Sequence, residues 1–273
     1  MASPAAAGSS VLAAVASGDL EGAIRHVMEE VRAAPSALAP RLALFQLSAL
    51  AGDWPRASKQ LQALAELDAE AAPMARAYAA VIEAEAERRA VFAGTERPVC
   101  LGEPPAWMAM LSEALALDAR GSGAAAGELR GRALDEAATV AGELDDTPFG
   151  WIMDADVRLG PVLEVIVEGR YRWLPMVQLT ELRADPPSDH KDLVWAPVRL
   201  TLVGGGELAA FVPVRYPGSE AAADPLVRLG RLTTWADEPG GQFGSGQRIM
   251  ATDVGDHPFL EIRRVRLGSS SHG

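Results

Sequence analysis

The 273-residue chain contains 25 lysine and arginine residues against 37 aspartate and glutamate residues, a formal net charge of -12. That charge repels phosphate backbones, which argues against nucleic-acid binding and favours a basic partner surface. Cys100 is the single cysteine, so no intrachain disulfide can form, which fits a reducing compartment such as the cytoplasm. The N-terminus lacks a secretory signal pattern, and no stretch reaches the ~18 apolar residues of a membrane span.

The composition changes near the middle of the chain. Ala, Leu, Glu and Arg, which favour helices, dominate up to Leu144, whereas Val, Trp, Tyr and Thr alternate with polar residues after Asp145. We therefore predict an α+β protein with two domains. Residues 1–145 are expected to form tetratricopeptide-like antiparallel helical hairpins, and residues 146–267 an antiparallel β-rich domain, either a sheet or a small barrel. Residues 268–273 are expected to form a flexible tail.

Two segments of the first part repeat with a spacing of 34 residues. Residues 18–23 (Gly-Asp-Leu-Glu-Gly-Ala) match residues 52–57 (Gly-Asp-Trp-Pro-Arg-Ala). This period is typical of tetratricopeptide helix-turn-helix units. In each segment we expect the glycine to adopt a left-handed turn, the aspartate to cap the next helix, and Leu20 or Trp54 to wedge between helices. A degenerate third unit is predicted to begin at Gly121.

Helical periodicity and cap signals predict seven helices. They are expected over residues 10–17, 19–34, 38–51, 53–68, 73–93, 105–119 and 123–142.

The second part has the pattern of β-hairpins. The dipeptide Glu168-Gly169 predicts a two-residue hairpin turn. The triplet Gly204-Gly205-Gly206 predicts another turn and not a phosphate-binding loop, because neither Lys-Ser/Thr nor a helix follows it. Strands are expected over residues 162–167, 171–174, 193–203, 208–214, 248–252 and 259–267.

Candidate catalytic residues do not form a recognisable constellation. The sequence has no Gly-x-Ser-x-Gly elbow, and Cys100 has no histidine near it in sequence. A small, partly buried residue is the better interpretation of this cysteine. We therefore predict no catalytic residue and no cofactor.

Two acidic groups are candidate metal sites, but neither has the spacing of an EF-hand loop or of paired histidines. Turn formation and ion pairing with Arg158, Arg170 or Arg215 explain them better, so we predict no metal site. The groups are Asp154, Asp156 and Glu164, and Asp253, Asp256 and His257.

Apolar residues of the repeat are candidates for contact with a partner helix on the concave face of the hairpins. They are Phe45, Leu47, Trp54 and Leu61. Each of them fits interhelical packing at least as well, because apolar residues at repeat spacing usually form core. The tryptophans of the second part, Trp151, Trp173, Trp195 and Trp235, are likewise expected in the core.

Several short motifs follow one another in a fixed order along the chain. They include Gly52-Asp53-Trp54, Gly102-Glu103-Pro104-Pro105, Arg158-Leu159-Gly160-Pro161, Arg215-Tyr216-Pro217-Gly218 and Gly246-Gln247-Arg248. On these motifs the chain resembles the ImpE/TagJ family of accessory proteins of bacterial type VI secretion, over nearly its whole length. The Gly- and Ala-rich stretch from Gly121 to Ala124 departs from the family pattern.

The resemblance implies a non-enzymatic adaptor in the cytoplasm. It implies binding to a helix of the sheath protein TssB and a connection between the sheath and the disassembly ATPase ClpV. The residues alone leave two alternatives. One is a small-molecule-binding or hydrolytic β domain covered by a helical lid, and the other is a structural part that only oligomerises.

Overall fold

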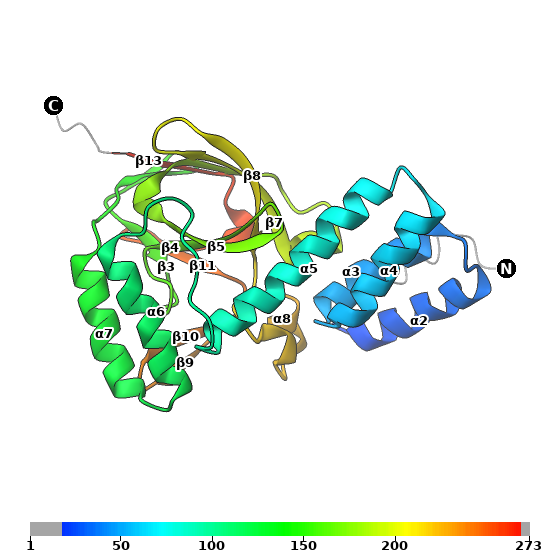
Figure 1. Cartoon of the computed structure of the whole chain (residues 1–273), viewed down its shortest axis with the longest axis horizontal. Coiled ribbons are helices and arrows are strands. Elements are labelled where there is room, and N and C mark those ends of the chain that lie inside the picture. Colours follow the sequence, from blue (N-terminus) through cyan, green and yellow to red (C-terminus); the bar gives the residue numbers. More distant parts are fainter. Residues whose placement is uncertain (1–17, 269–273) are drawn as a thin grey trace.

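The computed structural model describes residues 18–268. The predicted helix over residues 10–17 and tail residues 269–273 lie outside the described part. Within it the chain is α+β, as predicted, with helices in the first half and antiparallel strands in the second (Figure 1). The division into two domains at residue 145 stays a prediction. The first strand begins at Gly142, before that boundary.

The six predicted helices within the described residues agree with the structure to within one residue, except at one end, and one short helix was not predicted. The helix predicted over residues 123–142 stops at Glu136, because residues 142–144 are paired in the sheet instead. The helices are α2 (Leu20–Ala33), α3 (Leu38–Leu50), α4 (Trp54–Leu67), α5 (Ala72–Phe92), α6 (Ala106–Ala119), α7 (Gly123–Glu136) and the short α8 (Pro225–Arg228).

The repeat has the predicted local structure. Gly18 and Gly52 have φ angles of +87° and +70°, in the left-handed region. Asp19 and Asp53 each accept a hydrogen bond from the backbone N–H three residues on, at 2.8 and 3.0 Å. The third unit differs, because α5 separates it from the first two. Figure 1 places α6 and α7 at the opposite end of the molecule from α2, α3 and α4.

An open eight-stranded sheet, and not a closed barrel, forms the centre of the second half. Its strand order is β2-β1-β13-β6-β7-β8-β4-β5, and the strands are antiparallel. They are β1 (Gly142–Leu144), β2 (Thr147–Phe149), β4 (Val162–Val167), β5 (Arg170–Pro175), β6 (Leu179–Ala184), β7 (Trp195–Leu202), β8 (Glu207–Pro213) and β13 (Arg264–Leu267).

Two small sheets accompany the large one. One pairs β9 with β10, and the other has the order β12-β11-β3. Their strands are β3 (Ile152–Asp154), β9 (Thr233–Glu238), β10 (Gly241–Gly246), β11 (Ile249–Thr252) and β12 (Gly255–Pro258).

Both glycine turns are hairpin turns, as predicted. Glu168 and Gly169 have φ angles of +51° and +72° between β4 and β5, and Gly204 and Gly205 have positive φ between β7 and β8. Two predicted strands are wrong at their starts. A 3-10 turn (Phe259–Glu261) precedes β13, and another (His190–Leu193) precedes β7.

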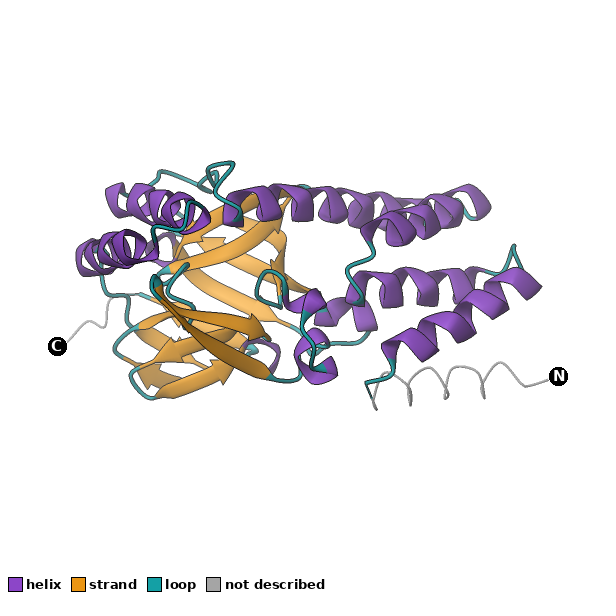
Figure 2. Ribbon diagram, turned by 90° about the horizontal axis from the view of Figure 1, so that it is seen from below, coloured by secondary structure: helices purple, strands orange, loops and turns teal. Residues whose placement is uncertain are grey.

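Strand β4 is buried on both faces and separates two cores. Val162 and Ile166 join the core shared with the helices, whereas Leu163 and Val165 join the second core, on the other face. Figure 2 shows the strands gathered at one end of the molecule and helical hairpins projecting from the other. Glu164 therefore enters the helix-side core as a charged residue, which requires compensation by partners.

Candidate functional site: a buried ionic cluster and two grooves

Charged side chains from α5, from β3 and β4, and from the residue before β11 meet between the helices and the sheet. Arg88 of α5 donates from Nε and Nη2 to the two carboxylate oxygens of Glu164, at 2.7 and 3.0 Å. Glu164 also pairs with Arg248, and Arg248 pairs with Asp154 of β3. All four side chains are buried. We call these four residues the ionic cluster; it fastens α5 to the sheet.

Two tyrosines complete the hydrogen bonding of the cluster. The Tyr171 hydroxyl donates to Glu164 at 2.6 Å and accepts from the indole N–H of Trp173 at 2.7 Å. The Tyr216 hydroxyl donates to Asp154 at 2.9 Å. Both carboxylates of the cluster are thus held by guanidinium and hydroxyl groups of the chain itself, as a buried charge requires.

The two carboxyl groups of the cluster have opposite pKa shifts. Burial raises the pKa of Asp154 to about 7, and Arg248 offsets only part of that rise. Burial also opposes ionisation of Glu164, but Arg88 and Arg248 outweigh it and lower the pKa of that carboxyl to about 2. The difference arises because Glu164 faces two guanidinium groups, whereas Asp154 faces one and lies beside Asp156.

The first acidic group, which is Asp154, Asp156 and Glu164, thus forms part of an ion-pair network. Asp156 pairs with Arg158, at 2.9 Å from Nε to Oδ1, and accepts from the Gly244 N–H at 2.8 Å. The prediction of pairing with Arg158 is confirmed. Pairing with the other two arginines is wrong, because Arg170 pairs with Glu87 on the surface and the side chain of Arg215 donates to backbone carbonyls.

The second acidic group and Cys100 have local roles. Asp253 accepts from the Gly150 N–H at 2.8 Å, and His257 lies 3.2 Å from the Thr252 hydroxyl in the β11–β12 hairpin. Within residues 18–268 no three His, Cys, Asp or Glu side chains are placed to hold a metal ion. Cys100 is partly buried beside β5, and burial raises the pKa of its thiol.

Arg215 joins the hairpins to the strands. Its Nη1 donates to the carbonyl of Leu50, at the C-terminal end of α3, at 2.8 Å. A cation at this end of a helix is favourable, because the last carbonyls lack partners and carry partial negative charge. Burial lowers the pKa of Arg215 to about 10.

The four predicted partner residues lie in the core that the helices share with the strands. Phe45, Leu47, Trp54 and Leu61 are 0%, 0%, 9% and 1% exposed. The ring of Trp54 lies 5.6 Å from that of Trp195, a residue of β7. All four are core residues of the chain itself. A partner helix can therefore contact only the exposed residues around these four.

One groove lies on the helical hairpins, between α2, α3 and α4. Its volume is about 530 Å³. Met28, Val31, Leu44 and Pro55 form its apolar floor. Four cationic side chains and one carboxylate also line the groove, namely Arg32, Arg41, Arg56, Lys59 and Asp53. We call this the helical groove.

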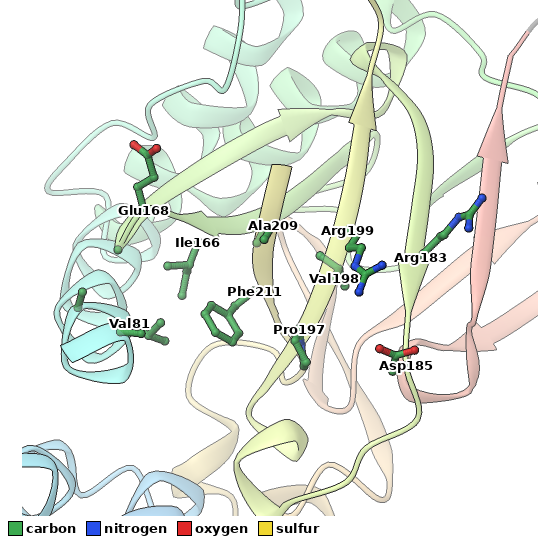
Figure 3. Close-up of a pocket in the computed structure, with 14 residues that line it drawn as sticks. Val81, Ile166, Glu168, Arg183, Asp185, Pro197, Val198, Arg199, Ala209 and Phe211 are labelled. Atoms are coloured by element: carbon green, nitrogen blue, oxygen red, sulfur yellow. The ribbon is translucent and has the colours of Figure 1, made fainter. Parts of the chain in front are cut away.

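A second groove lies on the face of β4, β8, β7 and β6, with α5 as its wall (Figure 3). Its volume is about 590 Å³. Val81, Ile166 and Phe211 lie at its apolar end, and Arg199 and Arg183 lie toward the other end. We call this the sheet groove.

The charges of the sheet groove are mixed. Arg199 lies opposite Arg183 in the β6–β7 register, and Glu168 and Asp185 also line the groove. Arg183 pairs with Glu181, at 3.1 Å from Nε to Oε2. Two carboxylates thus line the same groove as the two guanidinium groups.

Sequence reasoning missed Arg88 and Arg248 as the partners of the acidic group. Arg88 has acidic neighbours in its own helix, including Glu85, with which it pairs, so nothing local pointed to Glu164. Of the tryptophans, Trp173 and Trp195 are fully buried, as predicted, while Trp235 is exposed beside Tyr216.

A family model and a related protein both match this chain, and they agree with each other. Residues 146–266 match the family model described as ImpE protein. The chain is 48% identical to the type VI secretion system accessory component TagJ of Pseudomonas aeruginosa over 248 residues, which cover 91% of this chain and 87% of that protein.

A solved structure shares the fold. The crystal structure of a Vibrio parahaemolyticus protein superposes with a TM-score of 0.86 and 23% identity, and the match covers 96% of this chain and 98% of that one. No helix among residues 18–268 combines the length and the apolar character needed to cross a membrane.

Proposed function

We propose, because the chain belongs to the ImpE/TagJ family of type VI secretion accessory proteins, that it is a non-enzymatic adaptor of that system. The name of its relative describes an accessory component. The carboxylates of the first acidic group, Asp154, Asp156 and Glu164, all form ion pairs within the chain. That arrangement supports a scaffold over the small-molecule alternative.

We propose further that the adaptor binds a helix of the sheath protein TssB and links the sheath to the ATPase ClpV. The observation that carries this proposal is the presence of two grooves on different elements of one chain. A groove with an apolar floor suits an amphipathic helix, which presents anchors at i, i+3, i+4 and i+7. Two separate grooves allow two partners to bind at once, which an adaptor requires.

Because the predicted contact residues are buried, the partner is proposed to touch the groove residues above them. Met28, Val31 and Pro55 are partly or fully exposed in the helical groove. Ala77, Ala209 and Pro197 are exposed in the sheet groove. Both surfaces are accessible without unfolding the core.

The test uses the purified full-length chain with purified TssB and ClpV of the same system. We expect a binary complex with each protein and a ternary complex on size-exclusion chromatography with light scattering. The ternary complex is the decisive result, because only an adaptor holds both at once. Mutually exclusive binding would rule out the linking role, and binding to neither would rule out the adaptor.

A further inference from the structure

The helical groove is cationic in a chain whose net charge is -12. Arg32, Arg41, Arg56 and Lys59 line it, while Asp53 is the one carboxylate among the residues that line it. Lys59 is one of only two lysines in the sequence. The groove therefore carries a positive field that opposes the charge of the molecule as a whole.

Among residues 18–268, three of these cations lack a partner of opposite charge, and two of the three are exposed. Arg56 pairs with Asp53, at 3.0 Å from Nη2 to Oδ2, and Arg41 donates from Nη1 to Gln60 at 3.1 Å. Among residues 18–268, Arg32 and Lys59 form no ion pair, and both are exposed. Their charges are thus available to groups outside the chain.

The floor between the cations is apolar and short. Met28 and Val31 are partly buried, Leu44 is buried, and Pro55 is exposed. Pro55 and Lys59 of α4 are four residues apart, which is about 6 Å at 1.5 Å per residue, or slightly more than one helical turn. Such a floor accommodates two or three apolar side chains of a docked helix.

We propose that the helical groove binds an amphipathic helix of a partner protein whose short apolar stripe is flanked by carboxylates. The apolar stripe packs on Met28, Val31 and Pro55, and the flanking carboxylates meet Arg32 and Lys59. Arg32 lies in the last turn of α2, and Lys59 lies on α4. The two cations therefore reach the partner helix from two different helices of the groove.

The sheet groove provides a matched comparison. Its two arginines, Arg183 and Arg199, lie in a groove that also contains Glu168 and Asp185, so its charges are balanced. An acidic helix gains little there, because these carboxylates oppose it. The proposal thus assigns the acidic partner to the helical groove alone. It rests on the adaptor function only in requiring a protein partner, and it does not depend on which protein that is.

The test measures binding of two designed, fluorescein-labelled stapled helices to the full-length chain by anisotropy. Both peptides carry Leu at i, i+3 and i+4; one has Glu and the other Lys at the flanking positions. We expect the Glu peptide to bind, and the Arg32→Glu/Lys59→Glu variant to bind it about tenfold more weakly or worse. The Arg183→Glu/Arg199→Glu variant, with the same change in net charge, should bind within about twofold of the original chain.

Other results overturn the proposal. They are equal binding of the Glu and Lys peptides, binding of neither, and loss of binding in the sheet-groove variant but not in the helical-groove variant. Binding of the Glu peptide should also weaken with salt, because exposed charges are screened beyond about 8 Å at physiological ionic strength. A chain dimer that dissociates in the helical-groove variant would identify a second copy as the occupant instead.

A separate set of titrations tests the adaptor function. TssB and ClpV are each titrated against the same two double variants, after circular dichroism has shown that both variants are folded. If the peptides behave as expected but neither protein binds the original chain, the groove chemistry stands and the type VI adaptor role fails. If TssB or ClpV binds but the peptides do not, the adaptor role stands and the groove chemistry fails.

Discussion

The helical groove and the sheet groove are both lined by apolar and charged residues, but the pairing of their charged residues differs. In the helical groove Arg32 and Lys59 have no ion-pair partner among the described residues, whereas in the sheet groove Arg183 pairs with Glu181 at 3.1 Å. Cations alone therefore do not define a docking surface. The carboxylates beside them decide whether the charge is available to a partner.

The two grooves also have different supports. The helical groove is formed by hairpins that contact the strands through Arg215 and through the Trp54–Trp195 pair. The sheet groove has α5 as one wall, and α5 is held by the ionic cluster. A change to one support should therefore affect one groove more than the other, which the following substitutions examine.

The largest expected effect comes from Arg248→Ala. It leaves Asp154 and Glu164 buried with fewer partners, and breaking a buried pair in this way costs about 3–5 kcal/mol. Urea unfolding followed by circular dichroism measures the loss. Arg170→Ala is the control, because it removes an exposed pair with Glu87 and should cost less than about 1 kcal/mol. Equal losses in the two variants would contradict the assigned role of the cluster.

The pH dependence of stability should distinguish the two carboxylates of the cluster. The folded-state pKa of Glu164 is lowered to about 2, so its contribution is complete above its ordinary pKa of 4.5 and is lost as the pH falls toward 2. The folded-state pKa of Asp154 is raised from 3.8 to about 7, so ionisation costs stability as the pH rises through that range.

Unfolding free energies of the original chain, Glu164→Gln and Asp154→Asn across pH 3–7 measure both effects. As the pH rises from 3 to 4.5, the unfolding free energy of the original chain should increase relative to that of Glu164→Gln. As the pH rises from about 4 to 7, the unfolding free energy of the original chain should decrease relative to that of Asp154→Asn. Parallel curves for all three proteins would contradict both assignments.

Gly52→Ala should weaken the support of the helical groove. The φ angle of +70° costs an alanine about 1–2 kcal/mol, and the added Cβ would lie 2.6 Å from Cγ of Glu220, in a 3-10 turn (Ser219–Ala221) of the strand-rich half. Gly131→Ala is a suitable control, because an added Cβ there meets nothing within 4 Å in the middle of α7. It should stabilise the chain by up to about 1 kcal/mol. Thermal unfolding distinguishes the two variants, and a Gly52→Ala variant as stable as the original chain would contradict the left-handed turn.

The smallest expected effect concerns the sheet groove. Arg199 and Arg183 face each other across β7 and β6, and like charges in that position oppose strand pairing. Arg199→Glu replaces the repulsion by an attraction and should stabilise the chain by about 0.2–1 kcal/mol, as measured by urea unfolding at low salt. Arg199→Gln should show roughly half of that gain. A loss of stability in Arg199→Glu would show that the arginine has a partner that offsets the repulsion.

Local features of the fold were predictable from the sequence. The left-handed Gly18 and Gly52, the caps of Asp19 and Asp53, and the turn at Glu168-Gly169 depend on neighbours within a few residues. The strands β9 and β10 were missed, because the glycines at their turn and along β10 have the composition of a loop.

The ionic cluster could not be predicted, because its members are far apart in sequence. Arg88 and Glu164 are 76 residues apart, and Arg248 and Asp154 are 94 residues apart. No periodicity connects such positions. The Gly-rich departure near Gly121 has a long-range cause as well: an added Cβ at Gly123 would meet Pro239 at 3.0 Å, so α7 approaches the β9–β10 turn closely there.

The strand order has a consequence for how the protein is made. Strand β13, at the end of the described chain, lies between β1 and β6, so β1 and β2 have no place in the sheet before β13 arrives. Between Leu144 and Leu267 a ribosome adding about 5–20 residues per second takes roughly 6–25 s. The hairpins of α2, α3 and α4 are local and can fold while that synthesis continues. A nascent chain would thus carry its helical groove before its sheet is complete.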